Sequence, residues 1–200
     1  MAYFKYDQTQ LDYLRKKDAV LGKAIDSIGQ IDREVTPDLF EGLISSIIAQ
    51  QISSKAADTV WSRFVTLAGE VTPLRVASLD VETIQKQGMS TRKATYIKSI
   101  SESILIGAFD LEGLAALSDE DVAKALKSLP GIGVWTAEML MIFSMQRQDI
   151  LSWDDLAIRR GMMRLYGLET LDRATFETHR KNYSPYGSVA SLYLWELSVI

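Results

Sequence analysis

Residues 128–160 are the part of this chain that most limits how it folds. They read as a tight turn, an apolar helix, a loop ending in Asp154 and Asp155, and a second helix. In the turn, residues 130–133 (Pro-Gly-Ile-Gly), proline fixes its own φ and glycine adopts backbone conformations closed to other residues. A turn leading straight into a helix points unpaired N–H groups outward, where they bind an anion such as a phosphate. A phosphate site and a carboxylate pair in one segment predict chemistry on a nucleic acid.

Composition limits the classes of protein that remain. With 200 residues, 47% of them hydrophobic, the chain can bury a core as one large domain or two small lobes. Its net charge of -4 weighs mildly against binding nucleic acid mainly through charge, but it does not exclude a local basic face. The absence of cysteine excludes disulfides, thiol nucleophiles, zinc–thiolate sites and iron–sulfur clusters.

The sequence contains no targeting or membrane signal that we recognise. Its first residues lack the apolar core of a signal peptide, and no apolar run approaches the roughly 20 residues that span a bilayer. We therefore expect a cytoplasmic protein associated with the nucleoid, or a nuclear one in a eukaryote, with no membrane partner.

Helical periodicity runs through nearly the whole chain, and no alternating strand pattern with hairpin turns interrupts it. We expect a helical stretch over 8–28 with a possible break at Gly22, and a helix starting at Thr36-Pro37-Asp38. The final helix, over 185–199, should be buried on more than one side. His179, the only histidine, is predicted to lie at the surface. The chain is predicted to be all-α.

Four motifs in order resemble the helix–hairpin–helix DNA glycosylases, and in particular the AlkA-like 3-methyladenine branch. Along the chain they occupy residues 47–53, 88–94, 129–137 (Leu-Pro-Gly-Ile-Gly-Val-Trp-Thr-Ala) and 153–159 (Trp-Asp-Asp-Leu-Ala-Ile-Arg). The chain looks like a compact member without an N-terminal β-rich domain. The resemblance implies one glycosylase unit over residues 1–200 with two helical lobes and a DNA-binding cleft between them. One lobe is 36–120 and contains the wedge residue; the other is 1–35 plus 121–200.

The resemblance assigns the chemistry to Asp155. A departing base leaves a sugar with oxocarbenium character, which a nearby carboxylate stabilises while it activates the attacking water. The first turn of a helix favours the ionised carboxylate. Asp154 is then expected to be the N-cap. The alternative is that both acids are only helix caps.

The base pocket is expected to contain aromatic side chains. Trp135 stands where bifunctional relatives carry a lysine just after the hairpin glycines, so water should be the nucleophile and no strand cleavage should follow. An aromatic face also attracts a positively charged alkylated base. Tyr186 and Trp153 are the other pocket candidates. Ordinary packing is the alternative for all three.

The remaining implied roles concern DNA contacts. Gln51 takes the position of the side chain that fills the gap left by the flipped base, unless it is only a polar helix end. The hairpin should bind one phosphate through backbone N–H groups, and its carbonyls hold a monovalent cation, Na⁺ or K⁺, in relatives. No other cofactor is expected. The predicted DNA contacts are Gly131, Ile132, Gly133, Thr136, Arg92 and Lys93, and the predicted cation ligands are the carbonyls of Lys127, Leu129 and Ile132.

The predicted function is that of a monomeric, monofunctional DNA glycosylase of base excision repair, acting on alkylated purines in damaged double-stranded DNA. Two alternatives stay open: the same fold acting on deaminated or oxidised bases, or a non-catalytic module that binds distorted DNA through its hairpin.

Overall fold

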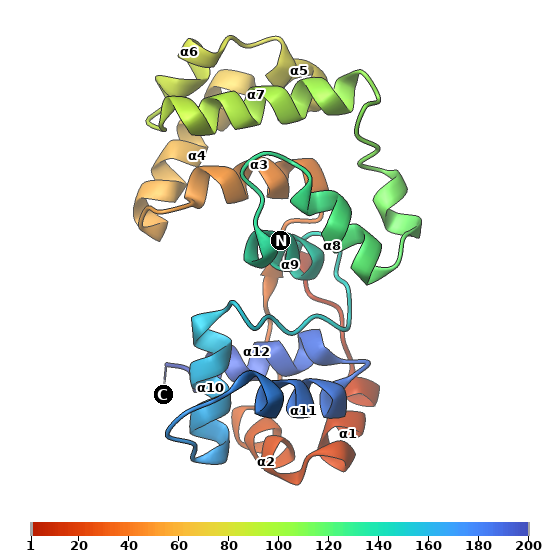
Figure 1. Ribbon diagram of the computed structural model, residues 1–200. Coiled ribbons are helices and arrows are strands. Elements are labelled where there is room, and N and C mark those ends of the chain that lie inside the picture. Colours follow the sequence, from red (N-terminus) through yellow and green to blue (C-terminus); the bar gives the residue numbers. More distant parts are fainter. Residues whose placement is uncertain (1, 200) are drawn as a thin grey trace. The chain divides into compact units, whose positions relative to one another are not determined.

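The computed structural model describes residues 2–199, and most of them are helical (Figure 1). Contacts between Cα atoms divide the chain into two compact units, one of Met1–Val35 with Met141–Ile200 and one of Thr36–Leu140. The predicted all-α fold is confirmed, with the addition of one short antiparallel pair in which Ala2 faces Val35. Among residues 2–199, no helix is long and apolar enough to cross a membrane.

The first unit contains both ends of the described chain. Its elements are β1 (Ala2–Tyr3), α1 (Gln8–Lys17), α2 (Ala19–Ile28), β2 (Glu34–Val35), α10 (Leu156–Tyr166), α11 (Arg173–Tyr183) and α12 (Gly187–Leu197). The second unit contains α3 (Leu39–Ala49), α4 (Ser54–Ala68), α5 (Pro73–Ala77), α6 (Val81–Gln85), α7 (Thr91–Leu105), a 3-10 turn (Gly113–Ala116) and α8 (Asp119–Lys127). Helix α9 (Val134–Phe143) starts in the second unit and ends in the first.

The helix break expected at Gly22 lies instead at Asp18. The Asp18 carboxylate accepts hydrogen bonds from the N–H groups of Val20 and Leu21, so it caps α2 directly after α1. Gly22 lies inside α2, where a Cβ would come within 3.2 Å of the Arg15 Cα. Helices α1 and α2 therefore run close together at this point, and a Cβ would need a shift of only a few tenths of an ångström. The helix expected to start at Thr36-Pro37-Asp38 has Asp38 as its N-cap and begins at Leu39.

Residues 121–140 belong to the second unit, and not to the lobe with residues 1–35 that the sequence predicts for them. Two contacts account for this grouping. The Gln50 side-chain amide donates to the Gly131 carbonyl at 2.9 Å. A Cβ on Gly131 would lie 2.5 Å from the ring of Tyr96 in α7, so the hairpin backbone runs directly against that helix.

Helices α10 and α12 pack closely in the first unit (Figure 1). A Cβ on Gly161 in α10 would lie 1.9 Å from the Leu194 carbonyl oxygen in α12, so only glycine fits at this position. Every residue of α12 from Gly187 to Leu194 is buried, which confirms that this helix is covered on more than one side. The packing of α10 bears on the predicted catalytic residue, Asp155, which directly precedes this helix.

His179 is largely buried, contrary to its predicted surface position. Its side chain is 21% exposed and its ring stacks on Tyr166 with 3.9 Å between centroids. The Tyr166 hydroxyl donates to Asp18 at 2.5 Å and lies 2.5 Å from the Tyr183 hydroxyl. The sequence could not show this cluster, because its members come from three separate segments: Asp18 before α2, Tyr166 in α10, and His179 with Tyr183 in α11.

This cluster predicts a loss of stability in mild acid. Burial lowers the pKa of His179, against an opposing effect of the Asp18 carboxylate. Just below the ordinary histidine pKa of about 6.5, the unfolded chain therefore binds more protons than the folded one, and the free energy of unfolding falls as the pH drops. Urea unfolding of wild type and His179→Phe at several pH values between about 7.5 and 5.5 measures this. The variant keeps a stacking ring and should show a flatter pH dependence; equal slopes would contradict the prediction.

Candidate active site

Asp155 is a buried carboxylate at the start of α10, only 7% exposed. One of its oxygens accepts hydrogen bonds from the N–H groups of Ala157 and Ile158, both at 2.9 Å. Asp155 is therefore itself the N-cap, and the expectation that Asp154 caps the helix is wrong; Asp154 is exposed. The two N–H donors and the positive end of the helix stabilise a negative charge at this carboxylate.

Trp153 is packed among charged and aromatic neighbours in the first unit. The guanidinium carbons of Arg159 and Arg173 lie 4.8 and 5.1 Å from its ring centroid. Its ring also meets the buried ring of Phe176 edge-on at 5.2 Å. A ring that already holds two cations is a poor partner for a positively charged base. These contacts indicate that Trp153 joins α10 to α11, and they disfavour its predicted role in the base pocket.

Tyr186 stands in a short loop between α11 and α12. Its ring is half-buried and meets Tyr13 edge-on at 5.1 Å. The Asp149 carboxylate holds the loop, because it accepts bonds from the Ser184 hydroxyl at 2.5 Å and the Gly187 N–H at 3.1 Å. The Tyr13 hydroxyl adds a third bond to the Ser184 carbonyl at 2.6 Å. Hydrogen bonds with Asp149 and Tyr13 therefore hold the loop that carries Tyr186.

The hairpin at 130–133 has the local structure that its sequence predicts. Gly131 has a φ of 84°, a conformation open mainly to glycine. The Ile132 N–H is used inside the turn, where it donates to the Leu129 carbonyl at 3.2 Å. Within residues 2–199, the N–H groups of Gly131 and Gly133 have no protein acceptor. A Cβ on Gly133 would meet nothing within 4 Å, so the space beside it is open.

The first turn of α9 presents one aromatic side chain and buries its neighbour. Trp135 is 46% exposed, which leaves part of its surface open for a ligand. Thr136 is 6% exposed. A side chain as buried as that of Thr136 does not reach DNA, so only its backbone remains available for the contact predicted at this position.

The predicted wedge follows the end of α3. Gln51 is exposed and has a φ of 60°, which is unusual for a residue other than glycine. Backbone strain of this kind is often found at functional sites. Of the two predicted DNA-binding cations nearby, Arg92 is exposed and its Nε donates to the Tyr96 hydroxyl at 2.6 Å. Lys93 is only partly exposed and donates to the backbone carbonyls of Ile48 and Gln50. Residues 48–51, which lead to the predicted wedge, are called the wedge segment.

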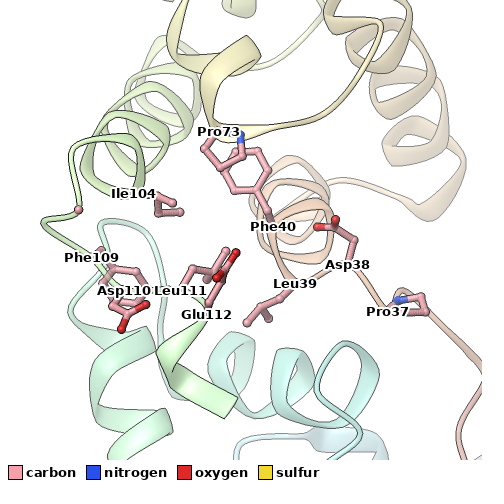
Figure 2. Close-up of a pocket in the computed structure, with 11 residues that line it drawn as sticks. Pro37, Asp38, Leu39, Phe40, Pro73, Ile104, Phe109, Asp110, Leu111 and Glu112 are labelled. Atoms are coloured by element: carbon pink, nitrogen blue, oxygen red, sulfur yellow. The ribbon is translucent and has the colours of Figure 1, made fainter. Parts of the chain in front are cut away.

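A separate hollow of about 690 Å³ lies at the opposite end of α3 (Figure 2). Leu39 and Phe40 contribute to it from the first turn of α3, about 16 Å along the helix from Gln50. Its lining includes the carboxylates of Asp38, Asp110 and Glu112, as Figure 2 shows, and none of the predicted site residues. Three acids disfavour a polyphosphate backbone, so this hollow is not the predicted DNA site.

Comparisons with known proteins agree with the motif-based interpretation. Residues 44–185 match the model of the HhH-GPD superfamily base excision DNA repair protein. The chain belongs to this superfamily. DNA-3-methyladenine glycosylase 1 of Schizosaccharomyces pombe is 35% identical over 164 residues, which are 80% of this chain and 72% of that protein. The family and its AlkA-like branch are therefore confirmed as predicted.

Solved structures give the same result. A DNA-3-methyladenine glycosidase from Bacillus halodurans superposes with a TM-score of 0.89 at 34% identity, over 99% of this chain and 93% of that one. The S. pombe 3-methyladenine DNA glycosylase in complex with abasic DNA gives 0.82 at 31% identity, over 96% and 98%. In the part of the chain that the structure describes, no group of three or more His, Asp or Glu side chains is placed to hold a metal ion.

Two residues with a role in shaping the site were not found from the sequence. Gln50 precedes the predicted wedge, and its amide reaches a carbonyl 81 positions away. Asp149 anchors the Tyr186 loop across 35 and 38 positions. Each is a polar residue next to a motif, but only the folded chain shows its partner.

Proposed function

We propose that this protein is a monofunctional DNA glycosylase that hydrolyses the N-glycosidic bond of alkylated purines, such as 3-methyladenine, in duplex DNA. The observation that carries the proposal is the buried Asp155 carboxylate at the start of α10, within the family's motif and held by two backbone N–H groups. The names of the relatives, which describe 3-methyladenine glycosylases, support the choice of alkylated purines as substrate.

Asp155 acts on the sugar in this proposal. The bond between the sugar C1′ and the base nitrogen breaks, and the base departs with the bonding electrons. The carboxylate stabilises the positive charge that develops on the sugar, and it orients a water and accepts its proton as the oxygen bonds to C1′. Because an alkylated purine carries a positive charge, it leaves as a neutral base. Residues 134 and 135 are valine and tryptophan, so no lysine follows the hairpin to attack the sugar, and an abasic site remains.

The second unit supplies the DNA contacts in this proposal. The N–H groups of Gly131 and Gly133 bind one phosphate, and the open space beside Gly133 allows a backbone to approach. Gln51 enters the gap left by the flipped nucleotide, and the exposed part of Trp135 faces the cationic base. Arg92 adds a cation near the DNA.

The hairpin also has carbonyls suited to a monovalent cation. Lys127 ends α8, and Leu129 and Ile132 flank the turn, so we include their carbonyls as ligands for Na⁺ or K⁺. The Leu129 oxygen accepts one hydrogen bond and has a second lone pair for a cation. The protein is proposed to act as a monomer on damaged DNA, in the nucleoid or the nucleus, with no other cofactor.

The proposal is tested by incubating the protein with methylated duplex DNA, followed by analysis of the released bases and of the strands before and after alkali. Release of 3-methyladenine is expected, with strands broken only after alkali. Breaks without alkali would contradict the monofunctional chemistry. Release only from deaminated or oxidised DNA would keep the glycosylase but change its substrate. No release from any of these, with tight binding to an abasic-site analogue, would indicate a DNA-binding module instead.

A further inference from the structure

Lys93 makes two hydrogen bonds that join α7 to the end of α3. Its ammonium donates to the Ile48 carbonyl at 2.8 Å and to the Gln50 carbonyl at 2.5 Å. The last carbonyls of a helix lack partners within the helix, and the negative end of the helix dipole attracts a cation. The side chain of Lys93 is only partly exposed, and burial lowers the pKa of Lys93. The Lys93 ammonium is therefore occupied by hydrogen bonds to other parts of the protein.

The segment that Lys93 holds is the one that presents Gln51. The peptide carbonyl of Gln50 is directly followed by Gln51, whose φ is 60°. A residue in this conformation persists only where the surrounding structure holds it. The Gln50 side chain extends the connection, because its amide donates to the Gly131 carbonyl in the hairpin. One ammonium and one amide therefore link the wedge segment to α7 and to the hairpin within the second unit.

We propose that Lys93 is a positioning residue that holds Gln51 for insertion into DNA, and that it is not the phosphate ligand that the sequence suggested. This inference rests on the proposed function, since it needs Gln51 to act as the wedge. Arg92 differs from its neighbour, because it is exposed and makes no bond to the wedge segment among residues 2–199. The motif's two adjacent cations thus have different roles.

The first test compares rates of base release from two substrates that carry the same single alkylated purine, one a duplex and the other a single strand. A wedge matters only in the duplex, where flipping leaves an unpaired base. Lys93→Met should lower the ratio of duplex to single-strand rates about tenfold, because the wedge is displaced. Lys23→Met removes a charge from an exposed position on α2 and should leave the ratio unchanged. An unchanged ratio in Lys93→Met would overturn the proposal.

Two further variants separate positioning from phosphate binding. Lys93→Arg keeps the charge, so a phosphate contact would survive it, whereas a planar guanidinium does not reproduce a point donor between two carbonyls. We expect it to lose duplex selectivity as Lys93→Met does. The double variant Lys93→Met with Gln51→Ala should be no worse than Gln51→Ala alone. The proposal would be overturned if the losses of the two single variants added in the double variant, and if Lys93→Met lowered the salt dependence of DNA binding by about one phosphate contact. Lys93 would then bind the DNA backbone.

A readout without chemistry keeps this test independent of the proposed reaction. A duplex with 2-aminopurine opposite an abasic-site analogue reports insertion of the wedge through its fluorescence. Binding of wild type should change the fluorescence, and Lys93→Met and Gln51→Ala should both bind with most of that change lost. A wild type that changes the fluorescence but releases no base would leave the positioning role standing and reject the glycosylase activity. A full change with Lys93→Met, or none with wild type, would overturn the positioning role.

Discussion

Asp155→Asn is expected to lower the rate of base release at least about 100-fold while leaving the fold intact. The substitution separates the two roles of this side chain. An asparagine oxygen accepts the same bonds from the N–H groups of Ala157 and Ile158, and asparagine is as good an N-cap as aspartate. The negative charge is lost, and with it the stabilisation of the sugar cation and the acceptor for the proton of water. Single-turnover base release and a thermal unfolding curve measure the two effects on the same protein.

Asp154→Asn is the matched control for this prediction. It removes the same charge from the adjacent residue, which is exposed and is not the cap of α10, and base release should stay close to that of wild type. Asp155→Ala should lose activity as Asp155→Asn does and in addition cost about 1 kcal/mol of stability through the lost cap. If Asp155→Asn retained wild-type rates, or if Asp154→Asn lost them instead, Asp155 would be only a helix cap.

Helical periodicity and local turn chemistry were sufficient to predict most of the secondary structure. The turn at 130–133 needs glycine for a reason that is local, since Gly131 has a positive φ. The final helix was recognised because apolar residues occupy all its sides, and its burial followed. Family motifs then placed Asp155 at a helix start, which the structure confirms. These features depend on residues close together in the sequence, so a linear pattern carries them.

The features that were missed depend on contacts between distant segments. The N-cap is a local exception, because adjacent aspartates before an apolar run fit the cap position equally well and only the folded chain shows that Asp155 occupies it. Lys93 reads as a cation beside Arg92, yet its ammonium bonds to carbonyls 43 and 45 positions away. Trp153 reads as a pocket aromatic next to the acids, but two arginines approach its ring. Residue type and spacing do not reveal such partners.

The residues that bind DNA in our proposal also explain how an acidic chain can act on DNA. Its net charge is -4, so it gains little from general attraction to the phosphate backbone. In this proposal the N–H groups of Gly131 and Gly133 form a local phosphate site that does not depend on net charge. Binding is then expected to rely on few contacts and on insertion of Gln51, which favours DNA that is already distorted by a lesion.

Gly161→Ala is expected to destabilise the protein by about 3 kcal/mol, the largest stability effect among the single substitutions considered. A Cβ at position 161 would lie 1.9 Å from the Leu194 carbonyl oxygen and 2.7 Å from the carbonyl carbon. Both are backbone atoms of α12, and they have no rotamer with which to move aside. Helices α10 and α12 must therefore separate, which opens the packing around Ile158 and Met162, both fully buried. Urea unfolding followed by circular dichroism measures the loss.

Gly22→Ala is the control for the general effect of replacing a glycine by alanine inside a helix, without the severe clash expected at position 161. It also adds a methyl group inside a helix, but the nearest backbone atom would be 3.2 Å away, and the gain of about 1 kcal/mol in helix propensity offsets the tight contact. We expect its midpoint to stay near that of wild type. Equal stability of Gly161→Ala and Gly22→Ala would mean that α10 and α12 are not held as close as the structure places them. The start of α10, and with it Asp155, would then lack the packing that we consider necessary to hold the carboxylate in place for catalysis.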